Sequence, residues 1–171
     1  MQNIYITGTG FWIPEDGLTT NDEVVNSYNA FVDNFNLDNA EAISAGSLEA
    51  LSHSSSEFIE KASGIKTRYL YDKHNCLDPN RMKPKTRAEL PDNTSILAEM
   101  GIESAKKAIA NAGITVDDID GIILGTSHSA RNYPAIAIEI QEALGINGYA
   151  YDMLVGCSST TFAISNAYSD I

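Results

Sequence analysis

The sequence has little cysteine, little positive charge and no long apolar run. Its two cysteines, Cys76 and Cys157, show no metal-ligand spacing, which argues against a disulfide framework and against a zinc site. Eleven Lys and Arg residues stand against 23 Asp and Glu, and the net charge of −12 argues against general nucleic-acid binding. No run approaches the roughly 18 apolar residues of a membrane span, and no basic residues precede the first apolar stretch. We expect a cytoplasmic protein with reduced thiols, no metal, and neither nucleic acid nor membrane as a partner.

The composition is that of a globular protein, with 43% apolar and 20% charged residues. Its positive charge is concentrated in one segment with only two acidic residues, Asp72 and Asp78. This basic segment holds Lys61, Lys66, Arg68, Lys73, Arg81, Lys83, Lys85 and Arg87. Such a segment on an acidic protein favours a phosphate-bearing ligand or an acidic partner, because the negative charge elsewhere repels both. A solvated loop whose basic residues bind nothing specific is the alternative, and charge alone does not decide between the two.

Cys157 has the sequence context of a nucleophile. The stretch 149–159 predicts a strand, a sharp turn at Gly156 and then a helix, with the thiol on the first helical turn. Free backbone N–H groups and the positive end of the helix dipole favour thiolate over thiol at that position. A buried structural cysteine is the usual alternative, since free cysteine packs as a small apolar residue. The strand-turn-helix context favours the nucleophile, and we predict Cys157 as the catalytic residue.

The order of the expected elements indicates an α/β protein. Patterns of apolar residues predict strands at 3–8, 121–126 and 149–154, and helices at 37–51, 54–62, 96–112, 135–144 and from 157 onward. Another helix begins at Thr20, where Glu23 completes a capping box, and residues 73–90 are expected to form a surface loop. The continuous apolar run at 121–126 predicts a strand buried on both faces. Strands alternating with helices predict a mainly parallel sheet covered by helices.

Four motifs in order resemble a known family. They are Ala62-Ser63-Gly64-Ile65-Lys66-Thr67-Arg68-Tyr69, Asp118-Ile119-Asp120 leading into Gly125-Thr126, Tyr133-Pro134-Ala135, and Ala150-Tyr151-Asp152 ahead of Cys157. With them the chain resembles the N-terminal half of β-ketoacyl-acyl carrier protein synthase III, a condensing enzyme of the thiolase superfamily. The insertion at 31–52 is most similar to the medium-chain, β-ketodecanoyl type.

The resemblance implies a fold, a reaction and partners. Residues 1–171 would form the N-terminal part of a thiolase-like fold whose C-terminal half is absent. Cys157 would take an acyl group from acyl-CoA, and the acyl-enzyme would condense with malonyl-acyl carrier protein to give a β-ketoacyl-carrier protein for fatty-acid synthesis. Coenzyme A thioester serves as substrate, with no separate cofactor, and family members are homodimers. The last helix ends without a glycine or a basic residue, so we expect a truncated chain that is inactive alone.

The resemblance also assigns residues, with departures from the family pattern. Phe58 stands where the family has a tryptophan that stacks on the adenine of coenzyme A, and Ala62 replaces a neighbouring arginine, so adenine binding should be weaker or differently built. Tyr133 takes the place of an aromatic residue that reaches across the dimer to line the partner's acyl pocket. A tyrosine packed at a helix start is the alternative. In the basic segment, we expect Lys66 and Arg68 to bind the phosphates or the carrier protein.

Other readings of the sequence stay open. A synthase of the same superfamily with another product, such as a polyketide starter or a head-to-head condensation product, would carry the same motifs. A non-catalytic partner or fragment is a rival of a different class, because the family's catalytic His and Asn lie outside this sequence. His53, His74 and His128 fall in no matching motif. We expect all three to be surface or loop histidines.

Overall fold

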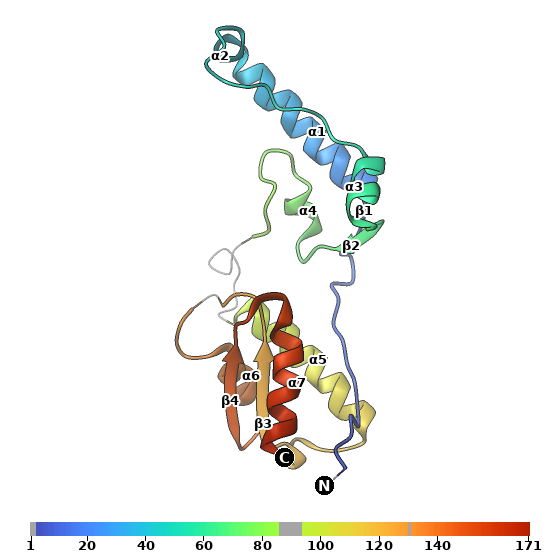
Figure 1. The fold of residues 1–171 in the computed structure, drawn as a ribbon, viewed down its shortest axis with the longest axis vertical. Coiled ribbons are helices and arrows are strands. Elements are labelled where there is room, and N and C mark those ends of the chain that lie inside the picture. Colours follow the sequence, from blue (N-terminus) through green and yellow to red (C-terminus); the bar gives the residue numbers. More distant parts are fainter. Residues whose placement is uncertain (1–2, 86–93, 130) are drawn as a thin grey trace. The chain divides into compact units, whose positions relative to one another are not determined.

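The computed structural model describes residues 3–85, 94–129 and 131–171. The chain divides into two compact units (Figure 1). We call Met1–Trp12 together with Leu90–Ile171 the sheet unit, and Ile13–Glu89 the helical unit. No helix in the described ranges is long and apolar enough to cross a membrane.

The sheet unit is built on two parallel strands, β3 (Gly121–Gly125) and β4 (Tyr149–Met153), paired from Gly121 with Tyr149 to Gly125 with Met153. Around them, in chain order, are α5 (Ile96–Ala112), the 3-10 turn η2 (Val116–Asp118), α6 (Ile136–Leu144), the 3-10 turn η3 (Gly156–Ser158) and α7 (Ser159–Asp170). The predicted helices and parallel strands of this region are therefore confirmed. Ser95 caps α5, and Gly113 and Gly145 end α5 and α6 in the left-handed conformation.

Helices cover both faces of the strand pair. Ala98, Ile102, Ile136 and Ile140 form the buried core between α5 and α6, and Ile122 and Leu124 of β3 pack against it. Ile123 points to the opposite face, where it lines a hollow together with residues of α7. Both faces of β3 are covered, as predicted, but its residues are half-buried, because β4 is its single partner strand in the described chain.

The predicted strand at 3–8 is wrong. Residues 3–12 have no regular secondary structure and run along α5 instead. Asn111 donates a hydrogen bond to the Thr9 carbonyl at 2.8 Å, and Lys107 donates to the Phe11 carbonyl at 3.0 Å. Alternating side chains favour a strand only where a partner strand takes up the backbone groups. In this segment helix side chains bind the carbonyl groups.

The helical unit has a short antiparallel pair, β1 (Leu18–Thr20) with β2 (Thr67–Tyr69). Its helices are α1 (Asn21–Asp38), α2 (Ala40–Ser44), α3 (Ser56–Ser63) and the single turn α4 (Lys73–Cys76). The predicted capping box of Thr20 and Glu23 is confirmed, and so is the helix expected near 54–62. The expected loop at 73–90 contains α4, and its residues 86–90 lie outside the described ranges.

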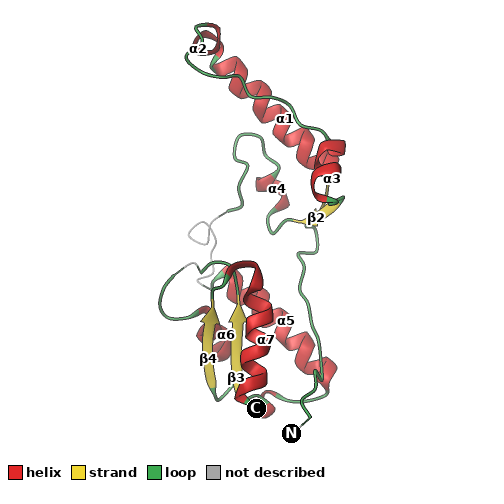
Figure 2. Cartoon of the chain, viewed as in Figure 1, coloured by secondary structure: helices red, strands yellow, loops and turns green. Residues whose placement is uncertain are grey.

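The helix predicted at 37–51 is confirmed only as far as Ser44: residues 37–38 end α1 and α2 follows, but residues 45–51 are not helical. Figure 2 shows an irregular segment between α2 and α3. Asn36 of α1 exchanges two hydrogen bonds with the backbone of Leu51, both at 2.9 Å, and Asn29 does the same with Ser54 at 2.9 and 3.1 Å. These amides bind the returning chain in an irregular path along α1. Contacts from a neighbouring helix therefore override the local helical preference of this segment.

Candidate active site

Cys157 lies on the turn that connects β4 to α7. The 3-10 turn Gly156–Ser158 leads directly into α7, and Gly156 has a φ of 60°, a conformation that favours glycine. Cys157 is exposed, and none of the described residues accepts a hydrogen bond from its backbone N–H. The thiol thus sits at the start of a helix beside a free donor, as the sequence predicted.

The side chain of Ser159 holds this turn in place. Its hydroxyl lies 2.7 Å from the Thr126 carbonyl and 2.9 Å from the Gly156 carbonyl, and it accepts a hydrogen bond from the Val155 N–H at 3.0 Å. Ser159 is 3% exposed. One buried hydroxyl therefore connects the end of β3, the turn carrying Cys157 and the first residue of α7. Sequence reasoning missed it, although a small polar residue on the inner side of a first helical turn was a usable signal.

The close approach of α7 to β3 requires a glycine at position 125. A Cβ added there would lie 2.9 Å from the carbonyl carbon of Ser159, closer than packed atoms tolerate. The motif Gly125-Thr126 is thus explained by contacts with α7: Gly125 leaves space for the α7 backbone, and the Thr126 carbonyl bonds to the Ser159 hydroxyl.

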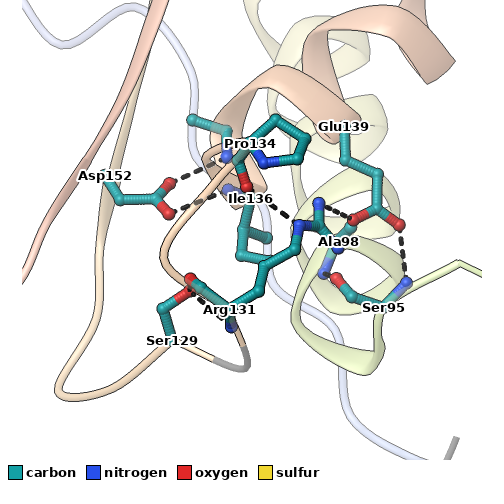
Figure 3. A network of polar contacts seen from close by, with 9 residues as sticks. Ser95, Ala98, Ser129, Arg131, Pro134, Ile136, Glu139 and Asp152 are labelled. Atoms are coloured by element: carbon teal, nitrogen blue, oxygen red, sulfur yellow. Dashed lines mark hydrogen bonds and ion pairs between the residues drawn. The ribbon is translucent and has the colours of Figure 1, made fainter.

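Two carboxylates organise the region before α6 (Figure 3). Asp152 of β4 accepts hydrogen bonds from the Ile136 and Ala137 N–H groups, both at 2.8 Å, and so caps a helix whose own N-cap residue, Ala135, supplies no side-chain bond. Glu139 accepts from the Ser95 N–H at 2.6 Å and pairs with Arg131 at 2.7 Å. Neither role was visible in the sequence, because both depend on which elements become neighbours in space.

The pKa of Glu139 is lowered from its usual range. Burial alone would raise it, but the hydrogen bond from the Ser95 N–H and the contact with Arg131 outweigh that effect. A depressed carboxylate pKa contributes stability above the unfolded-state pKa of about 4.3, and the contribution is lost as the pH falls through the folded-state value. The contact network of Glu139 should therefore weaken only in acid.

Tyr133 shares the sheet unit with Cys157, and 85% of its surface is exposed. It is therefore not packed at the start of α6 within this chain. The other predicted binding residues, Phe58, Lys66 and Arg68, belong to the helical unit.

Phe58 borders a pocket of about 620 Å³ between α1, α3 and the returning segment, lined also by Tyr28, His53, Ile59 and Met82. Its ring is exposed, as a stacking residue would need, and this volume suits a small organic ligand. Sequence reasoning missed the rest of this lining.

Several residues of the basic segment already have partners. Lys66 pairs with Glu60 at 3.1 Å, and Lys73 pairs with Glu23 at 2.6 Å. The Lys73 contact and the Thr20 N–H lower the pKa of Glu23 to about 2. Arg68 donates to the Thr20 carbonyl at 3.4 Å and to the side-chain oxygen of Asn21, so it anchors β2 to the start of α1. Arg87 lies outside the described residues.

The three histidines are on the surface, and the second cysteine lies in surroundings that disfavour a nucleophile. His53, His74 and His128 are exposed, as expected, and His53 pairs with Asp33 at 2.7 Å. Burial and the charge of Asp72 raise the pKa of the half-buried Cys76 thiol, which disfavours a thiolate there. Within the described ranges, no group of three or more His, Cys, Asp or Glu side chains could hold a metal ion.

Comparison with known proteins identifies relatives of the chain. No family model matches it. Over 145 residues it is 52% identical to a β-ketodecanoyl-[acyl-carrier-protein] synthase of Pseudomonas aeruginosa, covering 85% of this chain and 41% of that protein. A β-ketoacyl-[acyl-carrier-protein] synthase III of Bartonella tribocorum is 48% identical over 71 residues, 41% of this chain and 22% of that protein. The resemblance to β-ketoacyl-acyl carrier protein synthase III is confirmed.

The fold comparison agrees with the sequence comparison. The synthase III of Aquifex aeolicus matches with a TM-score of 0.63 and 24% identity, over 96% of this chain and 39% of that one. The OleA protein of Xanthomonas campestris matches with a TM-score of 0.65 and 16% identity, over 98% of this chain and 40% of that one. The predicted thiolase-like α/β fold is therefore confirmed. The chain spans about two fifths of the length of the Pseudomonas synthase.

We predict that Ser159→Ala destabilises the protein by about 0.5–1.5 kcal/mol, because the hydrogen bond from the Val155 N–H to the Ser159 hydroxyl is lost. It should also change the rate at which iodoacetamide alkylates Cys157, because the turn becomes less fixed. Ser158→Ala is the matched control, since Ser158 is exposed and its side chain caps no helix. Denaturant unfolding and alkylation kinetics measure both effects, and equal behaviour of the two variants would refute the role given to Ser159.

Proposed function

We propose that the protein containing this chain condenses an acyl-CoA primer with malonyl-acyl carrier protein to give β-ketoacyl-acyl carrier protein in fatty-acid synthesis. The observation that carries this proposal is the exposed Cys157 on a fixed turn at the start of α7, next to an N–H without an acceptor in the described chain. The names of the relatives, which are synthases of β-ketoacyl-carrier proteins, support it. We place the reaction in the cytoplasm, with coenzyme A thioester as substrate and no resident cofactor.

The chemistry follows from the thiol and its turn. The Cys157 thiolate attacks the thioester carbonyl of acyl-CoA, and the tetrahedral intermediate collapses with release of coenzyme A as its thiolate. Malonyl-carrier protein then loses CO₂, and the resulting carbanion attacks the acyl-enzyme carbonyl and frees the Cys157 thiolate. In this proposal the Cys157 N–H stabilises the oxyanion that forms in both steps. A preorganised donor of this kind contributes about 3–4 kcal/mol, and here Ser159 holds it in position.

The first test is acylation of the full-length gene product. After incubation with a medium-chain acyl-CoA and proteolysis, we expect the acyl group on the peptide that contains Cys157. Cys157→Ala should abolish labelling, and Cys76→Ala should leave it intact, because the Cys76 thiol is half-buried with a raised pKa. Label on Cys76, or none in the wild type, would refute the assignment.

The exposed face of the basic segment is our proposed contact for the acidic carrier protein or for phosphates of coenzyme A. Lys66 is the residue to test, because the Lys66 side chain is 75% exposed, whereas Arg68 bonds to Thr20 and Asn21. Reversing the charge at position 68 with Arg68→Glu would place a carboxylate next to the Thr20 carbonyl oxygen and the Asn21 side-chain oxygen. Its effect on binding could not be separated from damage to the fold.

We predict that Lys66→Glu raises the KM for the carrier protein severalfold with little change in kcat, and that the effect fades at high salt. Lys106→Glu is the matched control, because Lys106 is also an exposed lysine in an ion pair but lies in the sheet unit. Equal kinetics of Lys66→Glu and wild type at low salt would show that Lys66 does not bind the carrier protein, and would favour the alternative of a solvated segment without a specific ligand.

We propose that the protein is a homodimer in which Tyr133 lines the acyl pocket of the partner subunit. The support is its 85% exposure on a segment whose backbone is held on both sides, together with the resemblance of Tyr133-Pro134-Ala135 to the family. A ring with so little contact in its own chain is available to another surface.

We predict that Tyr133→Ala shifts acceptance toward acyl chains about two carbons longer, at a packing cost of roughly 3 kcal/mol or less. The kcat/KM values for a series of acyl-CoA donors, measured on wild type and variant, report the shift. Tyr5→Ala, at another exposed tyrosine of the sheet unit, is the control. An unchanged length profile in an intact dimer would show that the pocket ends elsewhere.

A further inference from the structure

The backbone around Tyr133 is held by a single arginine side chain. The Arg131 Nε atom donates to the Pro134 carbonyl at 2.8 Å, and its Nη2 atom pairs with Glu139 of α6 at 2.7 Å. Ser129 adds a hydrogen bond from its hydroxyl to the Arg131 carbonyl at 2.6 Å. The guanidinium thus links residues on both sides of Tyr133 to the first turns of α6 (Figure 3).

Glu139 in turn joins this segment to a second helix. Its other oxygen accepts from the N–H of Ser95, a buried residue that caps α5. The side chains of Arg131 and Glu139 are 33% and 19% exposed, whereas Lys106 and Glu103 form a pair of the same length at 56% and 42%. A partly buried pair with further hydrogen bonds is less screened than an exposed pair and holds its geometry better.

We propose that Arg131 and Glu139 are positioning residues that fix the backbone of Tyr133 and thereby set acyl chain-length preference, an inference that rests on the function proposed above. No described side chain forms a hydrogen bond or ring contact with the Tyr133 ring. The backbone of Tyr133 therefore sets the region that its ring can reach. Small displacements of a group that lines a substrate pocket have large effects on rate. A more mobile backbone at Tyr133 should therefore reduce the discrimination between shorter and longer acyl chains.

The contacts of Asp152 allow Glu139 to be altered without removing the N-terminal cap of α6. Asp152 binds the Ile136 and Ala137 N–H groups independently of Arg131, so α6 keeps its cap when Glu139 is altered. Removing the charge of Glu139 should free the segment 131–134 without unfolding the helix that follows.

The test compares Glu139→Gln with Glu103→Gln in the full-length gene product. Glutamine keeps an oxygen for the Ser95 N–H but loses the charge that attracts Arg131. We expect hydrogen exchange of the Arg131 amide, whose N–H donates to the Ser129 hydroxyl at 3.4 Å, to quicken severalfold in Glu139→Gln and to stay unchanged in Glu103→Gln. The Ile136 amide, which Asp152 binds, should exchange at the wild-type rate in both variants. Arg131→Lys, which keeps the charge but loses the planar fork, should show the same change if Glu139→Gln fails to fold.

The kinetic readout is the ratio of kcat/KM values for long and short acyl-CoA donors. We expect Glu139→Gln to move this ratio in the direction of Tyr133→Ala, because a less fixed Tyr133 limits the acyl length less sharply. Wild-type hydrogen exchange in Glu139→Gln would overturn the proposal. The proposal would also be overturned if Glu139→Gln exchanged faster but left the ratio of long-donor to short-donor kcat/KM unchanged, while Tyr133→Ala shifted that ratio. Absence of Cys157 acylation in wild type would instead refute the proposed function, and the exchange data would still decide whether the pair holds this segment.

Discussion

The hydroxyl of Ser159 is the contact on which the arrangement around Cys157 depends. It reaches the carbonyl groups of Thr126 and Gly156 and accepts from Val155, so the end of one strand and the turn after the next are joined through a single buried atom. The turn could adopt other conformations without it, because Gly156 has the freedom that its left-handed backbone requires. The position of the Cys157 thiol is thus determined by a neighbouring residue, Ser159.

Carboxylates provide the second level of organisation in the sheet unit. The core between α5 and α6 is small, so polar contacts at the ends of the helices have a large share in holding the elements together. Asp152 ties β4 to α6, and Glu139 ties α6 to α5 and to Arg131. Each carboxylate meets N–H groups at the N-terminal end of a helix, where the helix dipole favours negative charge. The acidic composition of the chain therefore includes structural carboxylates as well as surface charge.

Local signals in the sequence were sufficient for elements whose contacts are local. The Thr20–Glu23 capping box, the helices expected at 96–112 and 135–144, and the strands expected at 121–126 and 149–154 all appear in the structure as predicted. The strand at 3–8 and the second half of the helix at 37–51 were predicted wrongly. Asn111 of α5 binds the Thr9 carbonyl just after the first segment, and Asn36 of α1 binds Leu51 at the end of the second, and neither contact is visible in the local pattern. The place of Cys157 followed from its own neighbours, whereas the roles of Ser159 and Asp152 depend on which elements meet in space. Exposure, which decides whether Tyr133 can serve another subunit, was likewise not readable from the chain.

The central claim is that the turn held by Ser159 presents both a nucleophile and an oxyanion donor from one residue, Cys157. A crystal structure of the full-length gene product acylated with a medium-chain acyl-CoA tests it most directly. We predict a thioester on the Cys157 sulfur, with its carbonyl oxygen within about 3.2 Å of the Cys157 N–H and the Ser159 hydroxyl still bonded to the Thr126 carbonyl. A thioester carbonyl directed away from that N–H, or an acyl group on another residue, would contradict the account.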